Sequence, residues 1–506
     1  MLLFDFMFSE TLNASLVQSS LVCLATFSAI IWWLRPSRSR SLPPGPRGWP
    51  ILGYLPNIKF SEWCNGYQTH DVMCKLAEKY GAVFGLKIGS KDVLVLNDYE
   101  SIKEAFHHTN MNDRPENAMI KNIDNLGTGI LFSCGDKWKE IRKFTITKLK
   151  SFGIGKRSFA ENITIEAECL NSEIAKIQGN PFYSRPLLEP ATLNVISSIL
   201  LGQRFSYDDE ELHFILDNLH RNGKVVGSGG ALLFVPSLQI FLKDKIKEYR
   251  HNLDVVLKYF RGIVSKHQEE FDPYIEKDYI DAYISEMRHN KDKGKQSYLD
   301  VSNLVMTLGN LFAAGSFTTS ETLSWAILYL TKHPEIQKRA QEEIDNVLNQ
   351  NQPRLEDKPS LPYTWAVVLE TMRLATVGPL GVTHAVADDT RMFGCEIPKG
   401  TMIMPNLWNV HHDPALWSEP NEFKPERFLN ENGQVEEPPQ LIPFGTGRRS
   451  CPGEQLGKME LFIFITHLLQ KFNFKEAEGE SPLTLEGSLG LTWSPTPYHV
   501  CAHSRE

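Results

Sequence analysis

The order of apolar and polar positions beyond residue 50 predicts a body built mostly of helices. Between Val83 and Leu96, apolar positions alternate with polar ones and Gly and Asp mark turns, which predicts short strands. Helices are expected at Asp71–Tyr80, Ala160–Gln178, His251–Phe271, Leu299–Lys332, Pro334–Asn349, Tyr363–Leu374 and Leu456–Phe472. The charged stretch His289–Lys295 is expected to be a solvated loop. The predicted fold class is therefore mainly α with a small β region, in one body.

The chain begins with a different pattern. From Thr11 to Leu34 there is a run of 24 residues without a charge. A helix of that length would reach about 36 Å, enough for a hydrocarbon layer of about 30 Å. Two tryptophans end the run and three arginines follow it: Trp32, Trp33, Arg35, Arg38 and Arg40. By the positive-inside rule, residues 1–34 are predicted to be a membrane anchor that leaves the body in the cytosol.

A cleaved signal peptide is the alternative for this segment. It requires a basic start and a cleavage site of small residues, whereas this chain starts with Asp5 and Glu10 and the run ends in Trp-Trp-Leu-Arg-Pro. A retained anchor is favoured. Residues 35–50 are expected to be a basic, Pro-rich hinge, because Pro43, Pro44 and Pro46 favour extended backbone. Residues 51–506 then form the main body.

Composition and charge narrow the function classes. The chain has 506 residues, of which 42% are hydrophobic and 23% charged, as in an ordinary globular protein. A net charge of −8 argues against a nucleic-acid partner. The eight cysteines form no C-x-x-C pair, which argues against a zinc framework or a disulfide scaffold.

One cysteine lies in a sequence with a chemical signature. Cys451 follows Gly445, Gly447 and Arg449 and comes just before the predicted helix Leu456–Phe472. A thiolate before a helix N-terminus is favoured by the helix dipole and by free backbone N–H groups. Glycines would let a flat macrocycle approach the backbone, and an arginine two residues from the sulfur suits a carboxylate. A glycine-rich phosphate loop with an incidental cysteine is the competing interpretation.

This loop resembles the cytochrome P-450 superfamily, microsomal animal type, through the pattern F-x-x-G-x-R-x-C-x-G. The fixed positions are Phe444, Gly447, Arg449, Cys451 and Gly453. The resemblance implies the cytochrome P-450 fold, a single haem-binding domain preceded by a transmembrane helix. It also implies heme b with Cys451 as the axial thiolate ligand of iron.

Further motifs carry the same resemblance in the expected order. Glu370-Thr371-Met372-Arg373 is similar to the family's E-x-x-R, and Pro425-Glu426-Arg427-Phe428 to its P-E-R-F, whose arginine joins that pair. We assign both to the scaffold. Trp138-Lys139-Glu140-Ile141-Arg142 resembles the family's W-x-x-x-R helix, whose tryptophan and arginine contact the haem propionates. The resemblance therefore implies this role for Trp138 and Arg142. His384 and Arg114 occupy positions where related microsomal members add propionate contacts.

The helix expected over the haem departs from the family pattern (A/G)-G-x-(D/E)-T-(T/S). Here Gly315 and Thr318–Thr319 are present, but the acid is replaced by Phe317. In the family, the acid and the alcohol relay protons to bound oxygen. Glu321 lies one turn further on, and one hypothesis is that it restores the lost acid through water. The alternative is an ordinary polar helix residue.

The resemblance implies a monooxygenase that acts on a lipophilic substrate, such as a steroid, fatty acid or xenobiotic. It would use dioxygen, and NADPH through NADPH-cytochrome P-450 reductase, with cytochrome b5 as a second candidate partner. Its expected location is the endoplasmic reticulum membrane (microsomes), with the body on the cytosolic face. The lysines from Lys137 to Lys150 are expected to offer the reductase a basic face or to be merely solvated. The alternatives are a hydroperoxide isomerase or lyase of the same fold, which needs no electron donor, and a non-catalytic haem sensor.

Overall fold

The computed structural model describes residues 19–30, 42–49, 51–116, 127–228 and 243–505. Helices make up most of this part of the chain, as the sequence predicts. They are α2 (Leu55–Asn65), α3 (Thr69–Tyr80), α4 (Tyr99–His107), α5 (Gly129–Phe132), α6 (Gly135–Ser151), α7 (Arg157–Ala175), α8 (Arg185–Leu200), α9 (Glu210–Ser228), α11 (Lys243–Glu269), α12 (Tyr279–Asp292), α13 (Val301–Lys332), α14 (Pro334–Leu348), α15 (Pro362–Ala375), α16 (Leu407–His412) and α17 (Glu454–Lys471), with 3-10 turns at Thr109–Met111, Leu355–Ser360 and Pro425–Phe428.

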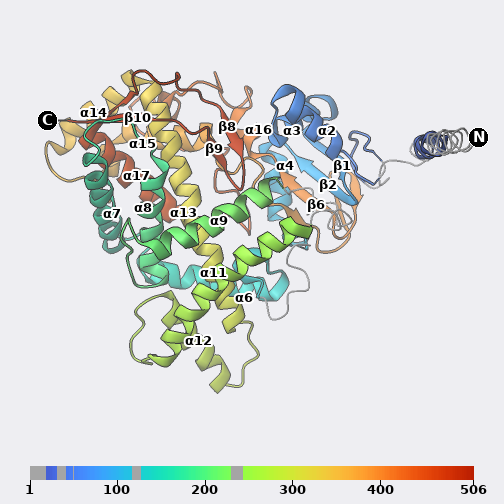
Figure 1. The fold of residues 1–506 in the computed structure, drawn as a ribbon, viewed down its shortest axis with the longest axis horizontal. Coiled ribbons are helices and arrows are strands. Elements are labelled where there is room, and N and C mark those ends of the chain that lie inside the picture. Colours follow the sequence, from blue (N-terminus) through green and yellow to red (C-terminus); the bar gives the residue numbers. More distant parts are fainter. Residues whose placement is uncertain (1–18, 31–41, 50, 117–126, 229–242, 506) are drawn as a thin grey trace, which may run out of the picture.

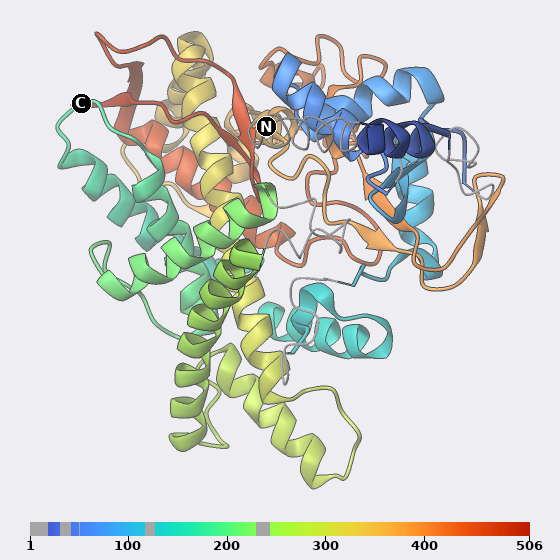
Figure 2. The same cartoon turned by 45° about the vertical axis from the view of Figure 1, so that its right-hand side comes forward.

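The largest sheet lies at one side of the helical body, and the two-stranded sheet at the C-terminal end of the chain lies at the opposite side (Figures 1 and 2). The largest sheet has four strands in the order β1-β2-β6-β3, and the β1–β2 hairpin confirms the strands predicted between Val83 and Leu96. The strands are β1 (Val83–Ile88), β2 (Lys91–Leu96), β3 (His384–Ala385), β4 (Thr390–Met392), β5 (Cys395–Ile397), β6 (Met402–Pro405), β7 (Phe472–Glu476), β8 (Gly487–Leu489), β9 (Trp493–Pro495) and β10 (Val500–Ser504).

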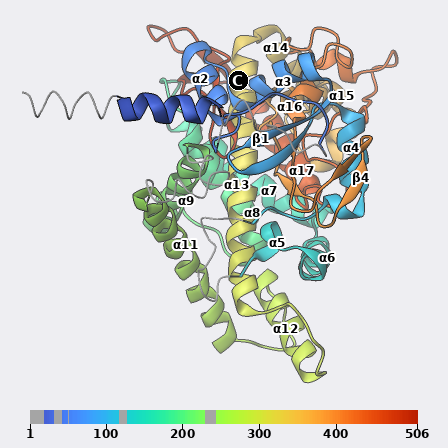
Figure 3. The ribbon, with the colours of Figure 1, turned by 90° about the vertical axis from the view of Figure 1, so that its right-hand side faces the viewer.

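Helix α13 is the central element and runs the length of the molecule (Figure 3). It packs against α8, α11, α15 and α17, so most of its side chains are buried. It begins after Asp300, whose carboxylate accepts a hydrogen bond from the backbone N–H of Asn303 at 2.8 Å. This cap satisfies a free N–H group of the first turn and sets the start of the helix. The segment predicted as Leu299–Lys332 is thus confirmed, shifted by two residues at its start.

The other predicted helices are also confirmed, with small shifts at their ends. The largest shift is in α11, which begins at Lys243 rather than at His251. The prediction of a loop at His289–Lys295 was wrong for its first half, because α12 continues to Asp292. Its charged side chains line the exposed last turn, where His289 and Lys291 complement the negative end of the helix dipole.

The predicted hinge packs on the sheet where the structure describes it. The backbone N–H of Gly85 in β1 donates to the carbonyl of Pro43 at 3.1 Å. A methyl group on Gly45 would lie 1.8 Å from the Gly85 carbonyl oxygen, so only glycine allows this approach.

The predicted anchor lies mostly outside the described residues, which omit 1–18 and 31–41. Residues 19–30 are helical and expose apolar side chains such as Leu21 and Phe27. Among the helices in the described part of the chain, none is both long enough and apolar enough to cross a membrane.

Candidate functional site

The loop that carries Cys451 is folded back on itself just before α17. The backbone N–H of Cys451 donates to the carbonyl of Phe444 at 2.9 Å, and the N–H of Gly453 donates to Cys451 Sγ at 3.3 Å. Gly445 and Gly447 both have positive φ, at 70° and 76°. The loop therefore presents the sulfur at the start of α17, as the sequence predicts.

Gly447 is required by the packing of the loop itself. A methyl group there would lie 2.3 Å from the carbonyl oxygen of Phe106 in α4. Only glycine therefore allows the loop to approach the backbone of α4 this closely. Gly315 in α13 is similar, because a methyl group there would lie 3.1 Å from Ile196 of α8. Both glycines fix how the elements around the site pack.

Cys451 borders an internal space. Its surface is accessible, yet the protein surrounds it closely enough that desolvation raises the pKa of its thiol. The Gly453 N–H and Arg142 oppose this rise, and Glu454 adds to it. The expected lowering of the pKa by the helix N-terminus is therefore outweighed by burial, so a bound metal would have to displace the thiol proton.

Three arginines and Trp138 surround this loop. Arg142 Nη2 donates to the carbonyl of Ser450 at 2.6 Å. Arg449 Nε and Nη2 donate to the carbonyls of Asn112 and Ser133, both at 2.6 Å, and its guanidinium lies 4.2 Å from the centre of the Trp138 ring. Arg114 Nη1 donates to the carbonyls of Val382 and Thr383 at 2.7 and 2.9 Å.

These arginines carry positive charge, and Asp113 acts on Arg449 only as a nearby negative charge without an ion pair. Burial and the repulsion of Arg449 and Arg142 lower the pKa of Arg114 to about 9, and burial also lowers the pKa of Arg449, to about 10. In the described residues, no carboxylate forms an ion pair with any of the three. Buried cations without an anion are unfavourable, so the cluster fits a group with its own carboxylates. A porphyrin with two propionates beside a cysteine ligand meets this requirement.

His384 lies next to this cluster in a neutral form. Its ring stacks on Phe106 at 3.9 Å, and Nδ1 is 3.0 Å from the carbonyl oxygen of Met111. Burial, together with nearby Arg114, lowers its pKa well below the usual value. If Nδ1 donates to that carbonyl, Nε2 has no proton, so a hydrogen bond to a propionate requires His384 to gain a second proton.

On α13, the predicted residues face different directions. Ala314 and Thr318 are exposed in the middle of an otherwise buried helix, and Thr318 Oγ1 donates to the Ala314 carbonyl at 2.8 Å. Ala314 and Thr318 form a strip with accessible surface, which we call the open strip. A helix that lines a binding site requires such a strip. Phe317 and Thr319 are buried. Glu321 is also buried and forms an ion pair with Arg185 of α8 at 2.8 Å.

The E-x-x-R and P-E-R-F motifs meet in the core, as expected. Arg373 Nε and Nη2 donate to the Glu370 carboxylate at 2.7 and 2.9 Å, and Arg427 Nε donates to it at 3.0 Å. Both Glu370 and Arg373 are fully buried. The network joins α15 to the segment before the Cys451 loop and has a scaffold role.

Sequence reasoning missed a buried acid, Glu460 of α17. Its carboxyl group is hydrogen-bonded to Thr319, and Oε1 has no partner among the described residues. Burial raises its pKa to about 8, although Thr319 opposes this. Glu460 therefore holds a proton at neutral pH. Only the apolar helix around it was visible in the sequence, because its partner lies on a distant element.

This carboxyl group makes a pH-dependent contribution to stability. Because the folded-state pKa is above the ordinary value of 4.5, its contribution is fully present below about pH 4.5 and is lost as the pH rises through about 8. Glu460→Gln is expected to remove this loss and to be more stable than the wild type at pH 9, by on the order of a few kcal/mol. Denaturant midpoints at pH 6 and pH 9 measure it. Glu342→Gln, at an exposed position, should change the two midpoints equally; the same result for Glu460→Gln would contradict the argument.

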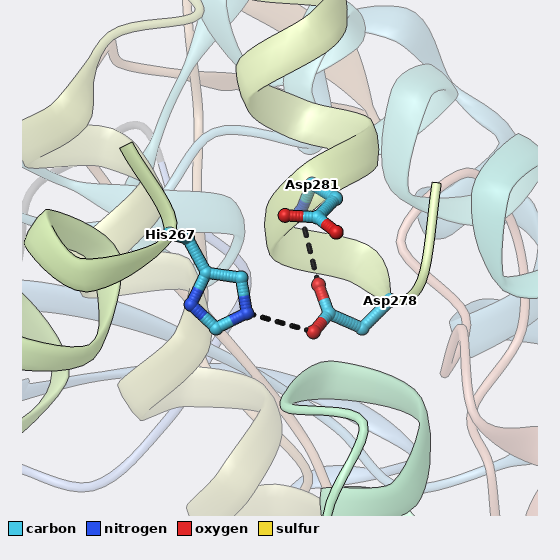
Figure 4. Close-up of side chains that lie close together, drawn as sticks. All are labelled: His267, Asp278 and Asp281. Atoms are coloured by element: carbon cyan, nitrogen blue, oxygen red, sulfur yellow. Dashed lines mark hydrogen bonds and ion pairs between the residues drawn. The ribbon is translucent and has the colours of Figure 1, made fainter. Parts of the chain in front are cut away.

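One group of side chains has metal-ligand types close together: His267, Asp278 and Asp281 (Figure 4). Their contacts are accounted for without an ion. Asp278 caps α12 through the backbone N–H of Asp281, and His267 Nε2 lies 2.8 Å from Asp278 Oδ2. The pKa of His267 is raised by its hydrogen bond to Asp278, as in an ordinary ion pair.

Comparisons with known proteins agree with this geometry. A family model described as Cytochrome P450 matches residues 43–502. Cytochrome P450 2U1 of Rattus norvegicus is 36% identical over 94% of this chain and 92% of its own length. Cytochrome P450 2J2 of Homo sapiens is 37% identical over 93% of each chain, and cytochrome P450 2K4 of Oncorhynchus mykiss is 35% identical over 94% and 95%.

Proposed function

The chain belongs to the cytochrome P450 family, and we propose that it is a microsomal monooxygenase that inserts one oxygen atom into a lipophilic substrate, with electrons from NADPH. Family membership implies haem with a cysteine thiolate as axial ligand, and Cys451 is the residue at the matching position. When bound, the haem supplies the activation of dioxygen. The observation that carries the proposal is the thiol of Cys451 beside three arginines that form no ion pair with a carboxylate of the described residues.

We assign the following roles to this chain's residues. Arg449, Arg142 and Arg114 hold the propionates, with Trp138 packed on Arg449 and His384 as a further contact. Phe444 and Gly447 shape the loop around Cys451. Thr318, Thr319 and Glu321 hold and move protons on α13. Ala314 on the open strip of α13 and Val382, whose carbonyl accepts from Arg114, are exposed apolar residues that would exclude water and favour a steroid, fatty acid or xenobiotic.

The proposed electron donor is NADPH-cytochrome P-450 reductase, with cytochrome b5 as an additional donor. The support is a row of lysines on α6, the helix whose Arg142 contacts the Cys451 loop. Lys143 and Lys150 are exposed on it, whereas Lys148 pairs with Glu276. An acidic flavin domain would be steered to such a face. Residues 1–34 would hold the protein in the endoplasmic reticulum membrane.

Turnover by the full-length holoprotein tests the proposal. With NADPH and the reductase, a panel of steroids and fatty acids should give oxygenated products at the expense of NADPH. Products from a fatty-acid hydroperoxide alone, with none from NADPH, would instead indicate a hydroperoxide isomerase or lyase, for which the absence of an acid at Phe317 is the motivating feature. Haem binding without any turnover would indicate a sensor.

A further inference from the structure

The face of α13 that carries Phe317 is covered by a histidine. Phe317 and Glu321 lie one turn apart on α13, so both point towards α8 and α9. The ring of His220, from α9, lies 4.7 Å from the ring of Phe317. A titratable side chain thus stands against the position where the family pattern has its acid and this chain has none.

His220 belongs to a compact group of charged side chains. Arg185 Nε lies 2.6 Å from Glu189 Oε1, and Arg185 Nη2 lies 2.8 Å from Glu321 Oε1. His220 Nε2 lies 2.9 Å from the same Glu189 oxygen and 3.1 Å from Arg185 Nη2. His220 Nε2 and Glu321 Oε1 therefore both lie within 3.1 Å of Arg185 Nη2. A single water molecule can bridge two atoms that are this close to a common neighbour.

The two partners of His220 Nε2 require opposite protonation. Glu189 accepts a hydrogen bond only if Nε2 carries a proton, whereas Arg185 donates only if it does not. Arg185 already has two carboxylates, so the bond to Glu189 is the one we assign. Nε2–H is then directed at Glu189, and Nδ1 is the ring nitrogen left to take up a second proton.

The charges and the burial of this group define a path for a proton, from solvent at His220 towards Glu321 on α13. It contains two carboxylates and one guanidinium, so a proton on His220 brings the group to neutrality. The side chain of His220 is 25% exposed and that of Glu321 is 1% exposed. Glu321 Oε1 lies close to Arg185 but has no hydrogen bond in the described residues, which leaves a buried oxygen that can accept a proton. One end of the group reaches solvent and the other reaches α13.

The pKa shifts of the neighbouring groups agree with this direction. Burial raises the pKa of Glu321, against the attraction of Arg185, so that this carboxyl group binds a proton more readily. For Glu189, burial has the same effect, but His220 and Arg185 outweigh it and lower its pKa. Tyr183 and Tyr498, whose pKa values burial raises, are further titratable groups beside Glu321.

We propose that His220 is the positioning residue through which protons from solvent reach Glu321, in place of the acid missing at residue 317. The proposal rests on the monooxygenase function proposed above. Solvent protonates His220 at Nδ1, and the imidazolium releases the proton on Nε2 to the water that bridges it to Glu321. Glu321 takes a proton from that water, and the ring regains its proton on Nε2 by exchange with solvent. Glu321 lies three residues from Thr318, whose hydroxyl borders the open strip. No electron or heavy atom moves in this step.

The first test is the fraction of NADPH that appears as product, measured from pH 6 to pH 9. His220→Gln is expected to lower this fraction about tenfold, with the rest released as hydrogen peroxide, and to flatten the pH profile. The effect is smaller than the 10² to 10⁴ of a direct general acid, because water can partly replace His220. His213→Gln is the matched control, since His213 is exposed on the same helix and its ring nitrogen Nε2 lies 2.7 Å from the Tyr207 carbonyl.

The second test reads the proton on Glu321 directly. The carbonyl band of protonated Glu321 is identified in the infrared spectrum as the band that Glu321→Gln removes. With substrate and reductase absent, this band should titrate at a different pH in His220→Gln than in the wild type. Wild-type coupling, wild-type pH profile and an unmoved band in His220→Gln would overturn the proposal. So would uncoupling in Glu321→Gln that His220→Gln does not share. If the wild type fails to oxidise any substrate with NADPH, the monooxygenase proposal fails instead, and the infrared titration still decides the role of His220.

Discussion

Replacement of Cys451 by serine is expected to abolish thiolate ligation and all oxygenation activity. The thiolate is the iron ligand that the family requires, and a serine hydroxyl is a far weaker ligand at neutral pH. The fold should survive, because the backbone N–H of Cys451 bonds to Phe444 and the N–H of Gly453 can donate to oxygen as it does to sulfur. The measurement is the optical spectrum of the reduced protein with carbon monoxide.

The expected spectrum for Cys451→Ser lacks the red-shifted Soret band of a haem thiolate. Cys395→Ser is the matched control, since Cys395 lies half-buried in β5, in a separate two-stranded sheet. Its spectrum should be that of the wild type. If Cys451→Ser also bound haem with an unaltered spectrum, neither the ligand assignment nor the function derived from it would stand.

The parts of the site that could be predicted from the sequence are those encoded at short range. The Cys451 loop and the E-x-x-R pair each lie within a few residues, so their spacing alone places the side chains together. The helix over the site was also predictable, because a long apolar segment with an Asp cap has few other structures open to it. Helix α8 was not predictable from the sequence. Residues on all of its sides are buried, so its sequence shows no polar face, and Pro190 lies within it.

The contacts that sequence reasoning missed join elements far apart in the chain. Gly447 packs closely against Phe106 and Gly315 against Ile196, and no local sequence pattern predicts either contact. The same holds for Glu460 with Thr319 and for His220 with Phe317. The departure at Phe317 was visible in the sequence, but its surroundings depend on how α9 packs over α13. The consequence for proton transfer therefore had to come from the structure.

The buried network around Arg373 explains how the scaffold holds the Cys451 loop. Besides Glu370, Arg373 donates to the carbonyls of His411 at 2.6 Å, Pro420 at 2.8 Å and Glu422 at 3.3 Å. His411 Nε2 in turn accepts the backbone N–H of Ile442 at 3.0 Å, where the loop begins. The side chain of Arg373 thus links α15 to the segment that leads to Cys451.

Arg373→Met is accordingly expected to destabilise the protein by about 3 to 5 kcal/mol, since it leaves the buried Glu370 with one arginine and the carbonyls of His411 and Pro420 without this donor. Denaturant midpoints and the fraction of haem retained during purification measure this. Arg339→Met, which breaks an exposed pair with Glu426, should cost less than about 1 kcal/mol. If Arg373→Met does not fold, Arg373→Lys should recover part of the loss, because it keeps a positive charge and hydrogen-bond donors beside the buried Glu370. A midpoint for Arg373→Met that matches the control would show that the network contributes little to the scaffold.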